Sequence, residues 1–294
     1  MTRLRRLGDA VLGLDRTDLA LRLTLLLLLL RPIGEPQLRP WVLLLAAVGL
    51  LAPTLARRPA LWGLLAGLAA WRVLADWPLA DNHAYLLIYW CLAIAISLAL
   101  PHPGTALALN GRWLIGLAFG FAVTWKGFLS ADYLDGTFFR VTLLTDPRLE
   151  SFSMLAGGLS LEQLVEAREV LWQHLDGAAF GGDEMPALPL RFEWLASFAT
   201  LWTLAIEVLI AISFLQPDRR RLTALRDPAL LVFCATTYAV ATVEGFGWLL
   251  VSIGLVQTEP DRSRTRLLYL GAFVLILFYR EIPWPDLLIG ALGV

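Results

Sequence analysis

The sequence predicts an all-α integral membrane protein: a polytopic bundle of about seven or eight membrane-spanning helices, with an amphipathic helix in one long outer loop. Three observations support this prediction. Hydrophobic residues make up 58% of the 294 residues and charged residues only 17%, and the mean hydropathy is +0.66. Apolar runs of membrane-spanning length recur along the chain, and Arg, Pro and Asp separate them. Residues 1–294 are therefore predicted to form a single membrane domain.

The N-terminal segment is predicted to be an uncleaved first span. A basic region with Arg3, Arg5 and Arg6 precedes a leucine run, an order that resembles a signal peptide. No small-residue cleavage site follows the run, and Arg31 and Pro32 begin a polar turn instead.

Further apolar runs predict the other spans in order. We expect spans near 17–33, 40–56, 59–76, 82–100, 112–131, 191–216, 228–257 and 265–280. The run at 228–257 is too long for one straight span, and Glu244 stands in its middle beside Gly245 and Gly247. A broken or re-entrant helix is expected there.

Arginine clusters predict the orientation in the cell membrane. They lie near the N-terminus, at Arg57 and Arg58, and at 219–226, which fall on one side of the membrane in the predicted span order. Because cytoplasmic loops are enriched in Lys and Arg, we expect a multi-pass protein with a cytoplasmic N-terminus.

The long connection at residues 132–190 then lies on the outer face. Ser160 and Gln163 form a capping-box pattern, and apolar residues recur at helical spacing over 161–175. This pattern predicts an amphipathic helix that lies on the membrane or caps the bundle.

Lys126 is the only lysine among 24 basic residues, and it stands near the outer end of the fifth predicted span. An amine can lose its proton where a guanidinium cannot, and burial favours the neutral form. Lys126 is therefore a candidate base or nucleophile. The alternative is a charged side chain that reaches out to the outer interface.

His83 is predicted to lie in the same leaflet as Lys126, at the outer start of the fourth span. A histidine there can orient a lysine, accept a proton or bind a polar ligand, and the alternative is an interfacial histidine that bonds to water. Trp125, next to Lys126, either stacks on an aromatic ligand or belongs to the interfacial belt formed by most tryptophans.

Two carboxylates fall inside predicted spans, where a charge must face the bundle interior or a cavity. Glu207 is predicted to form a structural ion pair with an arginine that also lies in an apolar run, Arg22 or Arg72. Glu244, in the broken helix, is the better candidate for a residue that lines a substrate site.

Several function classes are excluded. The sequence contains no phosphate-binding loop, no Ser-His-Asp arrangement and no nucleic-acid surface, and Cys91 and Cys234 form no metal-ligand spacing. We expect no metal and no nucleic-acid partner. The expected partners are the lipid bilayer, a lipid or quinol ligand, and, in one alternative, a peptide.

Two motifs resemble those of a known family. Asp81 to Leu86, with Asn82, His83 and Tyr85, looks like the motif Asn-Asn-His-x-Tyr-Leu, and Lys126 followed by 132–136 looks like Lys, then Asp-Trp-hydrophobic-x-Gly. Glu207 ahead of a basic turn is a weaker match. The chain thus resembles the horizontally transferred transmembrane (HTTM) family, the membrane region of vitamin K-dependent gamma-carboxylase-like proteins.

The resemblance implies that Lys126 is the catalytic base that deprotonates a reduced, vitamin K-like quinone, and that His83 belongs to the same site. Asn82 and Tyr85 then join Trp125 and Glu244 as candidate substrate-binding residues. The match has departures: Tyr133 stands where the family often has Trp, and 228–257 lacks an expected histidine. Because no counterpart of the carboxylase's soluble domain appears in this sequence, carboxylation of protein glutamate is not expected.

The preferred hypothesis is a bacterial inner-membrane enzyme, related to lyases or oxygenases, that uses Lys126 on a quinol-like or lipid substrate at the outer leaflet. One alternative is a non-catalytic membrane protein that assists maturation, export or immunity of a secreted peptide. A transporter with Glu244 at a broken helix is another.

Overall fold

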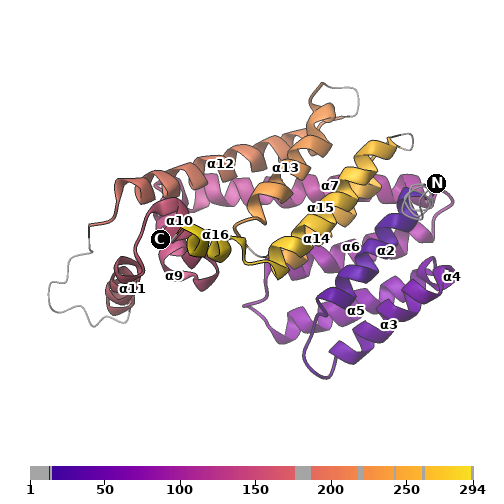
Figure 1. Cartoon of the computed structure of the whole chain (residues 1–294). Helices are drawn as coiled ribbons and strands as arrows, with labels where there is room; N and C mark the ends of the chain where they lie inside the picture. Colours follow the sequence, from indigo (N-terminus) through magenta and orange to yellow (C-terminus); the bar gives the residue numbers. More distant parts are fainter. Residues whose placement is uncertain are drawn as a thin grey trace. The chain divides into compact units, whose positions relative to one another are not determined.

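The computed structural model describes residues 13, 15–175, 187–217, 221–241, 243–259 and 262–292, and these residues form helices and loops without any β-strand. The all-α prediction is confirmed (Figure 1). The chain divides into two compact units. The first comprises Met1–Gly120, Leu209–Thr236 and Val243–Leu277, and the second Phe121–Val208, Thr237–Thr242 and Phe278–Val294.

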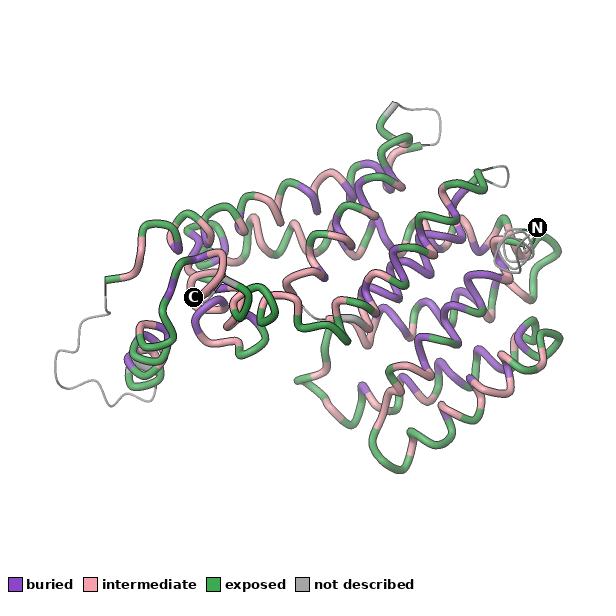
Figure 2. The backbone as a smooth tube through the Cα atoms, in the orientation of Figure 1, coloured by how far each residue is buried: buried purple, intermediate pink, exposed green. Residues whose placement is uncertain are grey.

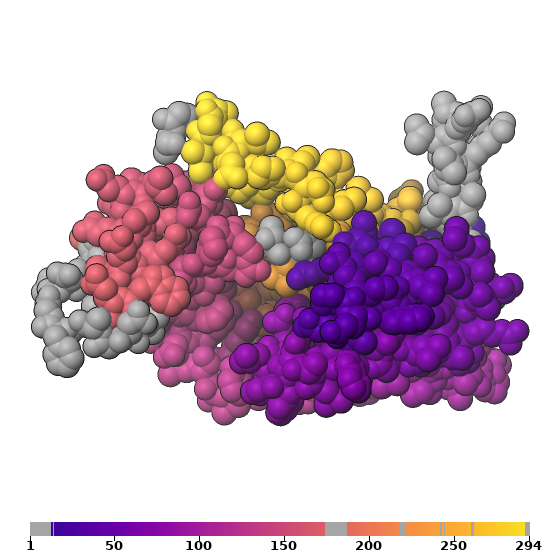
Figure 3. Space-filling model, turned by 90° about the horizontal axis from the view of Figure 1, so that it is seen from below, coloured from indigo at the N-terminus to yellow at the C-terminus, as the bar shows by residue number. Residues whose placement is uncertain are grey.

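The helices of the first unit follow the predicted apolar runs. They are α2 (Arg16–Leu30), α3 (Arg39–Leu51), α4 (Pro53–Ala56), α5 (Pro59–Ala75), α6 (Asn82–Leu98), most of α7 (Pro103–Thr124), the end of α12 (Leu190–Leu215), η3 (Arg221–Leu225), α13 (Arg226–Thr237), α14 (Glu244–Val256) and most of α15 (Ser263–Glu281). Helices α2, α3, α5 and α6 pack against one another in sequence order or as near neighbours. Their side chains, indigo to purple in Figure 3, form one continuous mass.

Two predicted runs are interrupted. The run at 40–56 splits at Pro53, which starts α4 because proline lacks an N–H and its ring clashes with the preceding helical turn. The run at 228–257 splits between Thr237 and Glu244, so the predicted helix break is confirmed. Glu244 begins the second half.

Few helices match the full thickness of a membrane. Among the described residues, Pro103–Leu129 and Leu190–Leu215 are long and apolar enough to cross, and Ser263–Glu281 with Trp284–Ala291, bent by 56°, makes a third if the pair is one span. Four other apolar helices have 10–17 residues. A helix of 17 residues is about 25 Å long, less than the roughly 30 Å of a bilayer core.

Helix α14 is the central helix of the first unit. Every residue from Gly247 to Val256 is buried (Figure 2). A helix that is apolar on all sides needs neighbours on all sides, and α2 and α6 supply two of them. A methyl group on Gly111 of α7 would lie 2.9 Å from Val256, and one on Gly254 would lie 2.6 Å from Tyr269 of α15. These glycines let the helices approach closely.

Three tryptophans of the first unit belong to its core rather than to an interfacial belt. Trp62, Trp90 and Trp248 are fully buried. Each indole N–H donates a hydrogen bond: Trp62 to the Ala56 carbonyl (2.7 Å), Trp90 to the Thr24 hydroxyl (2.9 Å) and Trp248 to the Phe273 carbonyl (3.0 Å). A buried indole is tolerated because its polar atom has a partner.

Two arginines bind the carboxyl-terminal end of α12. Arg112 donates to the carbonyls of Phe214 and Gln216, both at 3.0 Å, and Arg226 donates to Ser213 (2.8 Å) and Gln216 (2.6 Å). The last carbonyls of a helix lack intrahelical partners and carry partial negative charge, which a multi-donor guanidinium satisfies. These arginines therefore stabilise the end of a membrane-length helix.

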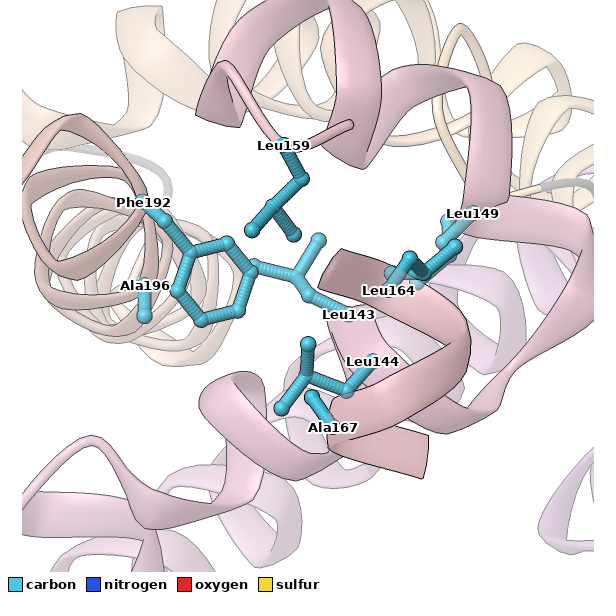
Figure 4. Packing of buried hydrophobic residues seen from close by; sticks show 8 residues of the cluster. All are labelled: Leu143, Leu144, Leu149, Leu159, Leu164, Ala167, Phe192 and Ala196. Carbon is cyan, nitrogen blue, oxygen red and sulfur yellow. The ribbon is translucent and has the colours of Figure 1, made fainter. Parts of the chain in front are cut away.

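The second unit contains the predicted outer connection. Its elements are the π-helical turn η1 (Trp125–Leu129), α8 (Ala131–Leu134), α9 (Thr137–Thr145), η2 (Pro147–Leu149), α10 (Glu150–Gly157), α11 (Leu161–Leu175), the first part of α12, and α16 (Trp284–Leu292). Figure 4 shows the Phe192 ring pointing toward Leu143, with Leu159 beside them. The connection is thus a packed helical unit with its own apolar core.

The predicted amphipathic helix is α11, and its capping box is confirmed. The Gln163 N–H donates to the Ser160 hydroxyl oxygen (3.1 Å), and the Ser160 N–H donates to the Gln163 side-chain oxygen (3.0 Å). Leu164 and Ala167 are buried in the core of the unit, whereas Trp172 is half exposed. One face of α11 therefore covers the unit, and contact of its other face with a membrane stays a prediction.

Replacing Ser160 by Ala is expected to destabilise α11 by about 0.5–2 kcal/mol, because the Gln163 N–H then loses its partner. Hydrogen exchange of the amides in 161–175 measures this effect. Gln173→Ala, an exposed position on the same helix, is the matched control. Equal exchange rates in the two variants would show that the capping box does not stabilise this helix.

Candidate functional site

Lys126 and Glu207 form a close ion pair in the second unit. Lys126 lies on η1, directly after α7, and Glu207 lies on α12. The Lys126 ammonium donates to the Glu207 Oε1 at 2.6 Å, and the two side chains are 22% and 7% exposed. A π-helical turn is rare and is found frequently at functional sites. The only lysine of the chain therefore lies on an unusual turn, against a buried carboxylate.

The second oxygen of Glu207 has no protein partner within the described part of the chain. Oε2 is buried and accepts no hydrogen bond from the described residues. Buried carboxylate oxygens are normally satisfied, so an unsatisfied one needs an explanation. A hydrogen bond from a ligand hydroxyl, or protonation of the Glu207 carboxyl group, would explain the unsatisfied oxygen.

Tyr133 of α8 lies against the same pair. The Lys126 Nζ is 4.9 Å from the centre of the Tyr133 ring, a cation–π distance. The ring is buried, with 3% of the residue exposed. Burial raises the pKa of Tyr133 above its usual value, an effect that the nearby Thr203 hydroxyl only partly offsets. Tyr133 is therefore neutral at physiological pH and acts as a hydroxyl donor or acceptor.

His83 lies in the first unit, near the start of α6. Its ring meets Phe246 edge-on with centroids 4.4 Å apart, and its buried Nδ1 has no hydrogen-bond partner among the described residues. Because His83 and Lys126 belong to different units, their predicted juxtaposition stays a prediction. On the same helix, Asn82 is exposed and Tyr85 half-buried.

The predicted partner of Glu207 needs correction. In place of a Glu207–Arg72 pair, Arg72 donates through Nε to Asp76 at 3.1 Å. Asp76 lies four residues further along the chain from Arg72, the spacing that favours a local ion pair at a helix end. The other candidate, Arg22, is exposed. Lys126 is the partner of Glu207.

For two further candidate substrate-binding residues, Trp125 and Glu244, the structure gives only part of the information needed. Trp125 precedes Lys126 on η1 and is 63% exposed, which suits contact with lipid as well as with a substrate. Glu244 is the first residue of α14, but its side chain lies outside the described residues. Its predicted role in lining a substrate site stays a prediction.

Sequence reasoning did not select Tyr133 as a site residue. The signal was its position seven residues after Lys126, a spacing that brings side chains to one face of a helix. The broken geometry after Lys126, with a π turn followed by a new helix, makes that spacing hard to interpret from sequence alone.

Nowhere in the described ranges do three His, Cys, Asp or Glu side chains come together as metal ligands. Comparisons of the chain with protein-family models, with curated proteins and with solved structures found no match.

Proposed function

We propose that the chain is a multi-pass membrane protein that uses the Lys126–Glu207 pair to take a proton from a lipid-soluble substrate with an acidic hydroxyl, such as a quinol. One observation carries this proposal: a solitary lysine lies 2.6 Å from a carboxylate whose side chain is 7% exposed and whose second oxygen has no partner among the described residues. Ionisable groups in membrane helices are costly and mark functional sites by default.

The proton balance suits such a pair. With one shared proton, as ammonium and carboxylate or as amine and carboxylic acid, the pair has no net charge. When the substrate O–H bond breaks, its electrons stay on oxygen and its proton passes to the neutral amine of the second form. The pair is then an ammonium beside a carboxylic acid and carries one positive charge next to the new anion, a step that a guanidinium cannot perform. Opposite charges at short distance stabilise each other strongly where water is scarce. The pair can thus promote ionisation of the substrate.

A separate observation supports a location in the membrane. Trp194, Phe198 and Leu201 lie at helical spacing on α12 and are 68%, 64% and 69% exposed. Such a continuous apolar stripe is unusual on a surface that faces water. We further propose seven or eight spans on the basis of the apolar runs in the sequence, and a cytoplasmic N-terminus and an outer position for residues 132–190 on the basis of the arginine clusters.

The resemblance to the HTTM family leads to the same residue. In that resemblance Lys126 is the base for a reduced quinone, and His83, Asn82 and Tyr85 belong to the site. Glu207 and Tyr133 lie against Lys126, so the proposed base is a lysine–carboxylate pair rather than an isolated neutral amine.

The test is the ionisation of a bound quinol. The protein is placed in lipid nanodiscs without oxygen, a reduced 2-methyl-1,4-naphthoquinone is added, and the absorbance of the quinolate anion is followed as pH rises. We expect ionisation in the wild-type protein about one pH unit or more below that in empty nanodiscs, and loss of this shift in Lys126→Arg, because a guanidinium keeps its proton.

Arg57→Gln provides the matched control. Arg57 pairs with Asp18 at 2.7 Å, but its side chain is 59% exposed, so the variant removes a cation from a surface pair. It should ionise the quinol as the wild type does. A wild-type protein that gives the same titration as empty nanodiscs would refute the proposed reaction.

A second candidate function is structural. The Lys126–Glu207 bond joins the segments Pro103–Leu129 and Leu190–Leu215, the two single helices of membrane-spanning length in the described part of the chain. A bond of this kind can hold two spans together in a non-catalytic protein. That alternative predicts an effect of these residues on stability alone.

A further inference from the structure

A groove opens between α13 and α15 of the first unit. Its volume is about 560 Å³, within the roughly 300–1,000 Å³ of small-molecule sites. Both helices pack on α14, because a methyl group on Gly254 would lie 2.6 Å from Leu230 of α13 and from Tyr269 of α15. A methyl group on Gly271, which lines the groove, would meet no atom within 4 Å. The groove is therefore open space between two helices that share a neighbour.

The lining of the groove is polar at one end and apolar along the rest. Asp227, Arg262 and Thr265 line it where α13 and α15 begin. Further along, the lining is aliphatic, with Leu231 on α13 and Leu268 on α15. The Leu268 residue is 60% exposed, so the apolar wall is uncovered. This distribution is complementary to an amphiphile with one head group and a hydrocarbon chain.

The length of the groove matches one leaflet of a membrane. At 1.5 Å per residue, the α13 wall from Asp227 to Ala235 is about 12 Å long, and the α15 wall from Thr265 to Leu275 is about 15 Å long. One leaflet is half of the roughly 30 Å hydrocarbon core, about 15 Å. An acyl chain whose head group lies at the polar end therefore fits the groove along its length.

Asp227 provides a hydrogen-bond acceptor at the polar end. Its Oδ1 accepts from the Gln257 side-chain amide (2.5 Å) and from the Tyr269 hydroxyl (2.9 Å). Both donors are neutral, so they orient the carboxylate without cancelling its charge. A charged donor such as an ammonium group bonds to a carboxylate about twice as strongly as a neutral donor bonds to a neutral acceptor. The carboxylate is thus a suitable binding group for an amine.

The arginines beside Asp227 bond to other groups. Arg226 donates to carbonyls at the end of α12, and Arg262 donates through Nε to Glu259 at 2.7 Å. The Arg262 side chain is 48% exposed at the polar end of the groove. This end therefore presents both signs of charge, as a zwitterionic head group does.

We propose that this groove binds one phospholipid with a primary-amine head group, its acyl chain along α13 and α15 and its ammonium group at Asp227. The phosphate, two carbons away from the amine in such a head group, then lies on the side of Arg262. The site rests on the membrane location proposed above, but it does not depend on the reaction proposed for Lys126.

The test is native mass spectrometry of the whole protein in detergent with added phosphatidylethanolamine, phosphatidylcholine or phosphatidylglycerol. We expect one phosphatidylethanolamine per chain, bound about fivefold or more tightly than phosphatidylcholine, whose quaternary ammonium has no N–H donor. Gly271→Leu fills the groove and keeps every charge, so this binding should weaken about tenfold or more. Gly67→Leu is the matched control, because a methyl group at this glycine of α5 also meets no atom within 4 Å.

A second variant tests the head group. Asp227→Asn keeps the shape of the side chain and removes its charge, so the preference for phosphatidylethanolamine over phosphatidylcholine should disappear while lipid still binds. Equal affinities for the three lipids in the wild type, or unchanged binding in Gly271→Leu, would overturn the lipid site. A dimer that forms without lipid and is lost in Gly271→Leu would overturn it as well and assign the groove to a second copy. Quinol ionisation should be the same in Gly271→Leu and the wild type, so the two proposals fail separately.

Discussion

Replacing Lys126 by Met is expected to lower the free energy of unfolding by about 3–5 kcal/mol, because Glu207 would keep a buried charge with neither oxygen paired. The Glu207 side chain is only 7% exposed, so water cannot take the place of the ammonium. Unfolding in mixed detergent micelles, followed by circular dichroism, measures the loss.

The double variant Lys126→Met with Glu207→Leu distinguishes the two functions. Removal of both charges from a buried pair is often neutral or stabilising, so most of the lost stability should return. If the pair serves only to join two helices, the double variant works as the wild type does. If the pair accepts a proton, the double variant is stable but no longer promotes quinol ionisation.

Two conservative substitutions separate the effect on stability from the effect on quinol ionisation. Lys126→Arg keeps the charge and the ion pair, so its stability should remain close to that of the wild type while quinol ionisation is lost. Glu207→Gln leaves the lysine with a neutral partner and should reduce both. Quinol ionisation that persists unchanged in Lys126→Arg would exclude proton acceptance by the amine.

Replacing Trp248 by Ala is expected to destabilise the first unit by about 3–5 kcal/mol, because it removes the largest side chain of the central helix α14. Trp248 is fully buried, and its ring stacks on Phe273 with centroids 5.3 Å apart. The change also leaves the Phe273 carbonyl without the indole donor. Thermal denaturation in detergent, monitored by the loss of monodisperse protein, measures the effect.

Two variants separate packing from hydrogen bonding. Trp248→Phe keeps most of the ring volume and removes the N–H, so it should cost about 1–3 kcal/mol. Trp194→Ala, at a position that is 68% exposed, should have little effect in the same detergent. A Trp248→Ala protein that melts with the wild type would contradict the central place of α14.

Features that depend on neighbours in the sequence were predictable. The capping box of Ser160 and Gln163, the helix over 161–175 and the break before Glu244 all follow from local rules, and the structure contains each of them. The end of α3 before Pro53 also follows a local rule, since proline cannot continue a helix, although composition alone suggested one run over 40–56.

Features that depend on long-range packing were not predictable. Glu207 pairs with a residue 81 positions away, and nothing in the apolar pattern distinguishes Lys126 from Arg72 as its partner. Tryptophan gives a similar lesson: Trp248 and Trp194 both lie in apolar runs, yet one is a core residue and the other is exposed. Burial depends on which helix faces meet, and composition does not specify that.

The π-helical turn at Trp125–Leu129 restricts how this stretch can change length. Because successive residues of a helix are rotated by about 100°, a turn with one additional residue shifts the angular phase of everything that follows it. Deletion of Gly127 would remove this additional residue and shift Tyr133, on the following helix, relative to the Lys126 ammonium. Between Lys126 and Tyr133, substitutions are therefore tolerated far more easily than insertions or deletions.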